Sequence, residues 1–234
     1  MTQCRVWHVS MRAYIERNSL SQFTRRLCLC IGALTFVAHA DAGQFSVRVT
    51  DPTGLPVTDA VVYANMITGT PPDRPKREIS VEQINKEFVP LVSVLQAGTL
   101  VNFPNRDTVR HHVYSFSPAK TFEIKLYSGV PGKPIMFEKA GEIVLGCNIH
   151  DTMLAYMLVV DTPIFSKTDK RGMALLDGLP AGEYEILTWY PGLTVAATPA
   201  PQKRKLSAND NAKLEFVFST KPQNPAILKS GTGK

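Results

Sequence analysis

Residues 141–160 read GEIVLGCNIHDTMLAYMLVV and contain the pattern that guides the interpretation of the rest of the chain. Two apolar runs, EIVLGC and MLAYMLVV, are rich in residues that favour β-strands, and they are joined by the loop CNIHDTM. Cys147 ends the first run, and His150 and Met153 follow in the spacing Cys-x2-His-x2-Met. A thiol, an imidazole and a thioether in one short loop indicate a metal site.

Short strand-like segments continue on both sides of this loop. Those before it read EISVEQI, LVSVLQAG, TLVNF, HHVYSF, TFEIKLY and PIMFE, and those after it include EYEILTW and KLEFVFS. Each is bounded by Gly, Pro, Asn or Asp, which are the residues that favour turns. Almost no segment has the apolar period of a helix. The pattern therefore predicts an all-β fold built as a sandwich.

The N-terminal segment has the features of an export signal. Residues 27–38, LCLCIGALTFVA, form an apolar stretch directly after two arginines, and small residues follow it. This order predicts a signal peptide over residues 1–40, cleaved after Ala40 or Ala42. The stretch is shorter than the roughly 20 apolar residues that a spanning helix needs. We therefore expect an exported, periplasmic protein without a membrane span.

Removal of the signal peptide changes the charge and the cysteine content. Residues 1–40 hold five of the 26 Lys and Arg residues and one of the 20 acidic residues, so the remaining chain has a net charge of +2. This small charge gives no argument for a nucleic-acid partner. One cysteine, Cys147, and three histidines, His111, His112 and His150, remain. An exported chain with one thiol cannot form an internal disulfide, whereas a metal-bound thiolate would explain the thiol.

These residues lie in two segments, the CNIHDTM loop and VNFPNRDTVRHHVYSF at residues 101–116. One thiolate, two imidazoles and a weak thioether form the ligand set of a type 1 (blue) copper site. The soft thiolate suits Cu(I), the imidazoles suit both oxidation states, and a distant thioether tunes the reduction potential. Zinc is the alternative metal, because Cys and His also bind it.

Residues 77–161 resemble the cupredoxin family, and within it amicyanin and the cupredoxin-like proteins of methylamine utilisation. EISVEQINKEFVPLVSVLQAGTLVNFPNRD looks like the opening strands of the family, and GEIVLGCNIHDTMLAYMLVV is similar to its closing hairpin. The Cys-x2-His-x2-Met spacing is the short loop of amicyanins and favours copper over zinc. The resemblance implies a Greek-key β-sandwich in which His111, Cys147 and His150 are equatorial copper ligands and Met153 is the axial ligand.

Two neighbouring histidines compete for one ligand position. Alternate residues of a strand face the same side, and His111 shares its parity with Val113. Because the family buries the apolar residue two positions after its ligand, we assign His111 to the metal. His112 stands where the family usually has an Asn that ties the two ligand loops together. Asp151 is a candidate to orient His150, although an acid in such a turn is more often solvated.

The flanking segments resemble a different module. VTDPTGLPVTDAVVYA and TDKRGMALLDGLPAGEYEILTWYPG are similar to the two ends of a carboxypeptidase-regulatory-like domain, a small prealbumin-like or Ig-like β-sandwich. The resemblance implies a discontinuous domain of residues 43–70 and 163–220, with the cupredoxin domain at residues 77–161 inserted into it. Insertion is physically easy where chain ends lie close together. The alternative is one cupredoxin with extra edge strands.

Three further segments have no predicted chemistry. Residues 68–77, TGTPPDRPKR, are rich in Pro and charge and predict a linker. The basic triplet Lys203-Arg204-Lys205 predicts a solvated loop. Residues 221–234 are polar, lack apolar periodicity and predict a disordered tail.

Together these patterns predict an exported blue-copper protein that carries single electrons between redox proteins and is not an enzyme. No His-Cys-His tripeptide for a trinuclear copper site, nucleophile elbow, P-loop or dinucleotide fingerprint occurs in the sequence. The resemblance implies a dehydrogenase as a possible electron donor and a cytochrome-like protein as a possible acceptor. The alternative is a copper-carrying or a glycan- or protein-binding β-sandwich without a redox role.

Overall fold

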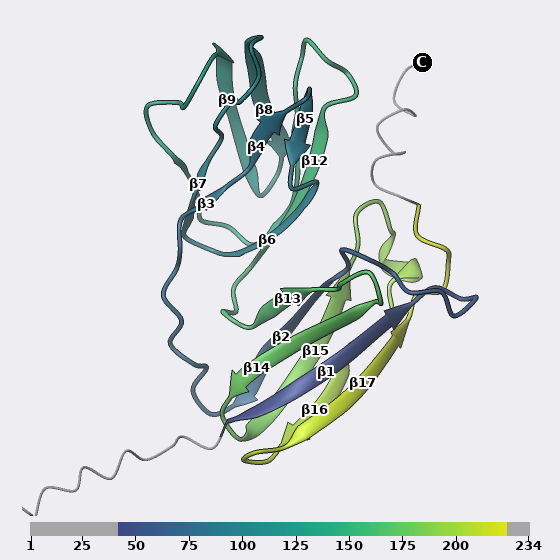
Figure 1. Ribbon diagram of the computed structural model, residues 1–234. Helices are drawn as coiled ribbons and strands as arrows, with labels where there is room; N and C mark the ends of the chain where they lie inside the picture. The colour runs from purple at the N-terminus through teal and green to yellow at the C-terminus, as the bar shows by residue number, and fades with distance from the viewer. Residues whose placement is uncertain (1–41, 224–234) are drawn as a thin grey trace, which may run out of the picture. The chain divides into compact units, whose positions relative to one another are not determined.

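The computed structural model describes residues 42–223 of the 234-residue chain (Figure 1). The predicted signal peptide and residues 224–234 of the predicted tail lie outside the described residues, and residues 221–223 have no regular secondary structure. The described part contains strands, one three-residue 3-10 helix and no α-helix, so the prediction of an all-β fold is confirmed. No helix in this range is both long and apolar enough to pass through a membrane.

The strands follow one another in short segments with tight connections. In chain order they are β1 (Gly43–Thr50), β2 (Val61–Thr68), β3 (Ile79–Ser80), β4 (Glu82–Ile84), β5 (Glu87–Val89), β6 (Val92–Gln96), β7 (Thr99–Asn102), β8 (His111–Ser117), β9 (Lys120–Tyr127), β10 (Ile135–Phe137), β11 (Gly141–Gly146), β12 (Leu154–Val160), β13 (Phe165–Lys167), β14 (Met173–Leu179), β15 (Gly182–Trp189), β16 (Gln202–Leu206) and β17 (Asn211–Val217). The helix η1 (Val195–Ala197) precedes β16.

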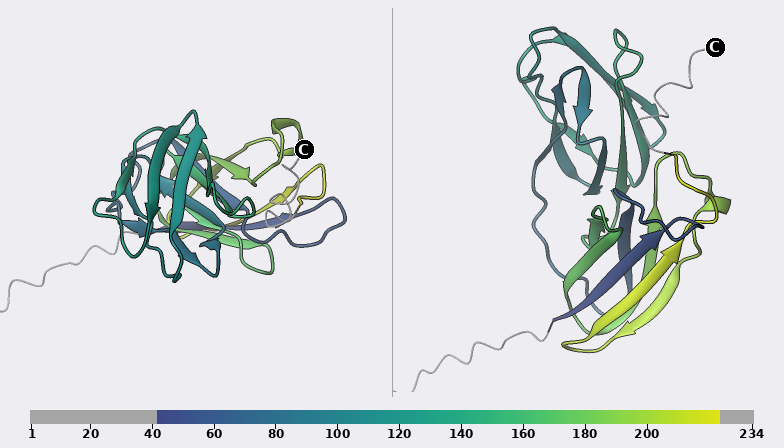
Figure 2. Two further views of the ribbon diagram at one scale, coloured as in Figure 1. Left: turned by 90° about the horizontal axis from the view of Figure 1, so that it is seen from above. Right: turned by 45° about the vertical axis from the view of Figure 1, so that its right-hand side comes forward.

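Strands from the two ends of the described chain form one pair of sheets with a common core. One sheet has the order β14-β1-β17 and the other the order β13-β2-β15-β16, and Figure 2 shows them from two further sides. In β1, Phe45, Val47 and Val49 are buried and alternate with more exposed residues, as expected of a strand with one core face. The Phe45 ring meets that of Tyr184 edge-on, with centroids 5.5 Å apart. Residues 43–68 and 165–217 thus share a core, and their assignment to a prealbumin-like domain stays a prediction.

The residues between them form a second set of sheets. A five-stranded sheet has the order β6-β12-β11-β8-β9, and a smaller sheet has the order β10-β7-β3. Their buried apolar side chains form a separate cluster, which includes Val81, Phe103, Val113, Cys147 and Met153. This arrangement is consistent with the cupredoxin-like β-sandwich that the sequence predicts.

The MLAYMLVV run is apolar without alternation because both faces of strand β12 are buried. Ala155, Met157 and Val159 point into the same core as Cys147. The residues of opposite parity, among them Tyr156 and Leu158, belong to a different buried cluster. A strand that is buried on both faces is a nearly continuous apolar run. The residues at the end of the metal-site loop are therefore held in place on both sides.

One local prediction was wrong. Lys203, Arg204 and Lys205 lie within β16, where they pair antiparallel with Glu185, Tyr184 and Glu183 of β15, and they are not in a loop. All three are exposed. β16 is an edge strand of its sheet, and charged side chains on an edge disfavour pairing with another chain. A basic run can therefore be a strand when one of its edges is left to solvent.

Candidate metal centre

The structure brings together three of the four predicted ligand residues. His111 begins β8, Cys147 directly follows β11, and His150 lies in the loop between β11 and β12. One donor atom from each lies within 4.8 Å of the others, and the two histidine ring centroids are 5.1 Å apart. His111 and Cys147 are buried, whereas His150 is partly exposed. This spacing is compatible with shared coordination of one ion.

Met153, the fourth predicted ligand, lies in the same loop. Its side chain is fully buried in the core that contains Cys147. Its backbone N–H donates to the His150 carbonyl oxygen at 2.8 Å, which folds the loop back toward β12. Coordination by the Met153 sulfur stays a prediction.

Strand pairing positions the thiol. Gly146, the last residue of β11, pairs with Tyr114 of β8, and β8 also contributes His111. A Cβ at Gly146 would lie 2.6 Å from the Tyr114 ring, so the ring passes over the backbone directly beside Cys147. A larger residue at this position would require the Tyr114 ring to move. The pairing of β8 with β11 brings Cys147 near His111, which is far from it in the sequence.

Three histidine nitrogens in this region are buried without a partner. The Nδ1 atoms of His111 and His150 have no hydrogen-bond partner, and neither has that of His112. An unsatisfied buried polar atom typically costs about 1–3 kcal/mol, so such atoms need an explanation. For His111 and His150 a metal ion would be the missing partner, because both rings lie close to the Cys147 thiol. One thiol and two unpartnered imidazole nitrogens fit a copper or zinc ion.

The two neighbouring histidines face opposite sides of β8. His111 is fully buried and on the same side as Val113 of the core. The His112 ring lies on the other side against Tyr114, with ring centroids 5.4 Å apart, and its Nε2 is 2.8 Å from an oxygen of Glu123. The cluster of His111, Cys147 and His150 therefore excludes His112, which has a separate partner on β9.

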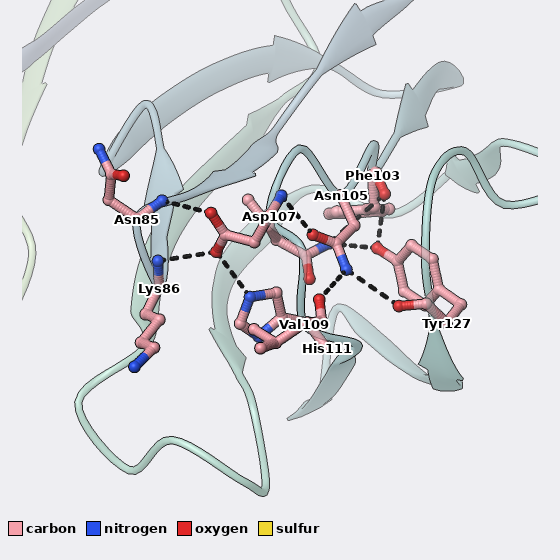
Figure 3. Close-up of polar contacts among 9 residues, drawn as sticks. Asn85, Lys86, Phe103, Asn105, Asp107, Val109, His111 and Tyr127 are labelled. Atoms are coloured by element: carbon pink, nitrogen blue, oxygen red, sulfur yellow. Dashed lines mark hydrogen bonds and ion pairs between the residues drawn. The ribbon is translucent and has the colours of Figure 1, made fainter.

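A carboxylate that sequence reasoning missed contacts the cluster. Asp107 Oδ2 lies 2.7 Å from His111 Nε2 (Figure 3). The same carboxylate accepts the backbone N–H groups of Asn85 at 2.7 Å and of Lys86 at 2.8 Å. Partial burial disfavours the charged form of Asp107, but the Lys86, His111 and Asn85 hydrogen bonds outweigh it and lower its pKa. Asp151, the sequence-based candidate to orient His150, is exposed, as an acid in such a turn usually is.

The loop around Asp107 is held by a buried amide. Asn105 Oδ1 accepts the backbone N–H of Asp107 at 2.9 Å, and its Nδ2 donates to the carbonyl oxygens of Val109 and Tyr127 at 2.9 Å each (Figure 3). Burial raises the pKa of Tyr127 to about 12, so its hydroxyl stays protonated and donates to the Phe103 carbonyl oxygen. The Asn-x-Asp spacing is the one sequence signal for this turn, and it does not reveal the contact with His111.

Comparison with known proteins gives similarity to copper proteins at low identity. No protein-family model and no curated protein matches the sequence. A Cu-containing nitrite reductase from Thermus scotoductus SA-01 is 23% identical over 49% of this chain and 28% of the reductase, with a TM-score of 0.34. A purple cupredoxin from Nitrosopumilus maritimus is 22% identical over 32% of this chain and 84% of its own length, with a TM-score of 0.29. Amicyanin from Paracoccus versutus is 17% identical over 42% of this chain and 98% of its own length, with a TM-score of 0.30. The functional assignment therefore depends on the side chains of the cluster.

Proposed function

We propose that this protein is an exported, periplasmic type 1 copper protein that carries single electrons between redox proteins and is not an enzyme. His111, Cys147 and His150 would hold the ion, with Met153 as a weak axial ligand. The observation that carries the proposal is a buried thiol beside two histidines whose Nδ1 atoms are buried and unpartnered. When bound, copper supplies a one-electron couple.

The chain supplies a rigid and dry environment for that couple. His111 begins β8 and Cys147 directly follows β11, which pairs with β8, so their positions depend little on the oxidation state. Met153 and Cys147 belong to a tightly packed apolar core that excludes water. The thiolate favours Cu(I), the imidazoles bind both oxidation states, and a weak axial thioether tunes the potential between them.

His150 is the ligand through which electrons would enter and leave. It is partly exposed, whereas His111 and Cys147 are buried. Ile149, beside it, is 46% exposed and offers an apolar contact to a partner. A dehydrogenase as donor and a cytochrome-like protein as acceptor would suit this small patch, because transient redox complexes bury less than roughly 1,200 Å².

Copper loading tests the proposed function. The protein without residues 1–40 is titrated separately with Cu(II), Cu(I) and Zn(II), and metal content, visible absorption and voltammetry are recorded. We expect one copper per chain, an intense thiolate-to-copper band and a reversible one-electron couple. Cu(I) binding without a reversible couple would indicate a copper carrier. A protein that takes up no metal would indicate a glycan- or protein-binding module.

Substitution of Met153 should shift the reduction potential without loss of the metal. Replacement by leucine removes a donor that contributes to Cu(II) binding, so the potential should rise. Replacement by glutamine offers a harder amide oxygen that prefers Cu(II), so the potential should fall. Each tenfold change in the relative affinity for the two oxidation states corresponds to about 59 mV. Voltammetry of the three copper-loaded proteins measures this, and three identical potentials would show that Met153 is not an axial ligand.

A further inference from the structure

We propose that Asp107 is a positioning residue of the metal centre. Its carboxylate holds the His111 ring with the proton on Nε2, keeps Nδ1 free for the metal, and makes this imidazole a stronger donor that favours Cu(II) over Cu(I). The inference rests on the proposed function and adds a residue that controls the relative stability of the two oxidation states.

The hydrogen bond decides which nitrogen of His111 carries a proton. Asp107 Oδ2 and His111 Nε2 are 2.7 Å apart, and an ionised carboxylate can only accept a hydrogen bond. Nε2 must therefore be the donor. In a neutral ring Nδ1 then carries a lone pair, and this atom is buried without a partner. The metal-binding atom of His111 is thus prepared before any ion arrives.

The carboxylate is itself fixed by a turn from another part of the chain. Asn85 and Lys86 connect β4 to β5 and have φ angles of 54° and 62°, as a type I′ turn requires. In this conformation both backbone N–H groups reach the Asp107 carboxylate (Figure 3). Two charge-assisted hydrogen bonds from rigid backbone hold the carboxylate more tightly than side-chain donors would.

Backbone pairing keeps this turn against the Asp107 loop. The Gln83 N–H donates to the Pro104 carbonyl oxygen, and the Arg106 N–H donates to the Gln83 carbonyl oxygen, both at 2.9 Å. The Arg106 guanidinium also lies 2.9 Å from the Glu82 carboxylate of β4. The Asp107 side chain is only 14% exposed. The position of the carboxylate is therefore built into the fold.

A carboxylate that is hydrogen-bonded to the outer nitrogen of a ligand histidine changes how strongly the other nitrogen binds a metal ion. It fixes the ring orientation and raises the basicity of the ligand, and loss of such a partner typically costs 10–100-fold in affinity or activity. A more basic imidazole stabilises the more highly charged ion. The Asp107–His111 pair should therefore favour Cu(II) and lower the reduction potential of the centre.

The matched pair of variants is Asp107→Asn and Glu123→Gln. Both replace a carboxylate that contacts a histidine of β8, but Glu123 contacts His112, which lies outside the cluster. An asparagine at position 107 has one acceptor oxygen for three N–H groups, so it loses at least one of these hydrogen bonds. When its amide faces His111 it donates to Nε2, which forces the ring proton to Nδ1.

Two measurements separate positioning from a general structural effect. Long-range proton–nitrogen NMR of the metal-free proteins reports the His111 tautomer, and we expect the Nε2-protonated form in the native and Glu123→Gln proteins and a shift toward the Nδ1-protonated form in Asp107→Asn. Competition titrations and voltammetry of the copper-loaded proteins report affinity and potential. We expect Asp107→Asn to lower the Cu(II) affinity at least tenfold relative to Cu(I), which raises the potential by at least about 59 mV.

The outcomes distinguish this inference from the proposed function. If the native protein takes up no copper or shows no reversible couple, the proposed function fails and this inference fails with it. If the native protein is a reversible copper protein but Asp107→Asn leaves its tautomer and potential unchanged, the inference alone is overturned. If Asp107→Asn does not fold, the NMR measurement of the native metal-free protein still tests the proposal. An Nδ1-protonated His111 in that protein would contradict it. Equal shifts in Glu123→Gln would also overturn it.

Discussion

Replacement of Cys147 by serine should abolish the visible absorption band of the copper-loaded protein. The band comes from charge transfer from the thiolate to Cu(II), and Cys147 is the one cysteine in residues 42–223. Serine is close in size, so the buried site should keep its shape while it loses the soft ligand. Absorption spectra at equal copper content measure the effect, and we expect complete loss of the band.

The same variant should lose most of its stabilisation by copper. A ligand at 100 times its dissociation constant stabilises a folded protein by about 2.7 kcal/mol, and this gain falls as the affinity falls. Unfolding curves with and without copper measure the difference. The control is Met157→Leu, which replaces another buried sulfur in the same core but lies outside the loop and should stay blue. A blue Cys147→Ser protein would contradict the assignment of the thiolate.

Removal of His111 should open the site, whereas removal of His112 should leave it intact. His111 is fully buried beside Cys147 and His150, so His111→Ala leaves a gap at the position of a ligand. Exogenous imidazole can fill such a gap. We expect His111→Ala to lose the native spectrum and to recover an intense band when imidazole is added.

His112→Ala is the matched control, because the two histidines are adjacent and differ in the side of β8 that they face. Its ring contacts Tyr114 and Glu123 on the side away from the cluster. We expect this variant to bind one copper ion, to stay blue and to show at most a modest shift in potential. Spectra before and after addition of imidazole test both variants. The reverse result would move the ligand by one residue and would require β8 to present its other face to the core.

Local features of the fold could be predicted from the sequence because they depend on neighbouring residues. Residues 44–50, QFSVRVT, alternate apolar with polar side chains, and the apolar ones, Phe45, Val47 and Val49, are the buried face of β1. The loop after Cys147 brings the thiol, His150 and Met153 into one short connection in any fold that pairs β11 with β12. Parity on a strand likewise predicted that His111 and Val113 lie on one side, and both are buried.

Features that depend on long-range pairing could not be predicted in this way. β1 pairs parallel with β17, the last strand within residues 42–223, and nothing in either strand specifies the other. The charged strand β16 lacks apolar alternation because it lies at an edge, where solvent satisfies its exposed side chains. The partner of His112 is Glu123, which only the antiparallel pairing of β8 with β9 brings into reach.

The identity of the candidate ligands was therefore determined by the sequence, and their surroundings were decided by the tertiary structure. Spacing and residue chemistry single out Cys147 and His150 as candidate ligands. Strand parity, together with the resemblance to cupredoxins, adds His111. The carboxylate on His111 belongs to Asp107 only because the β4–β5 turn packs against the loop before β8 and holds it there. That contact joins segments about 20 residues apart through backbone N–H groups. Every residue except proline carries such a group, so side-chain patterns leave no record of the contact in the sequence.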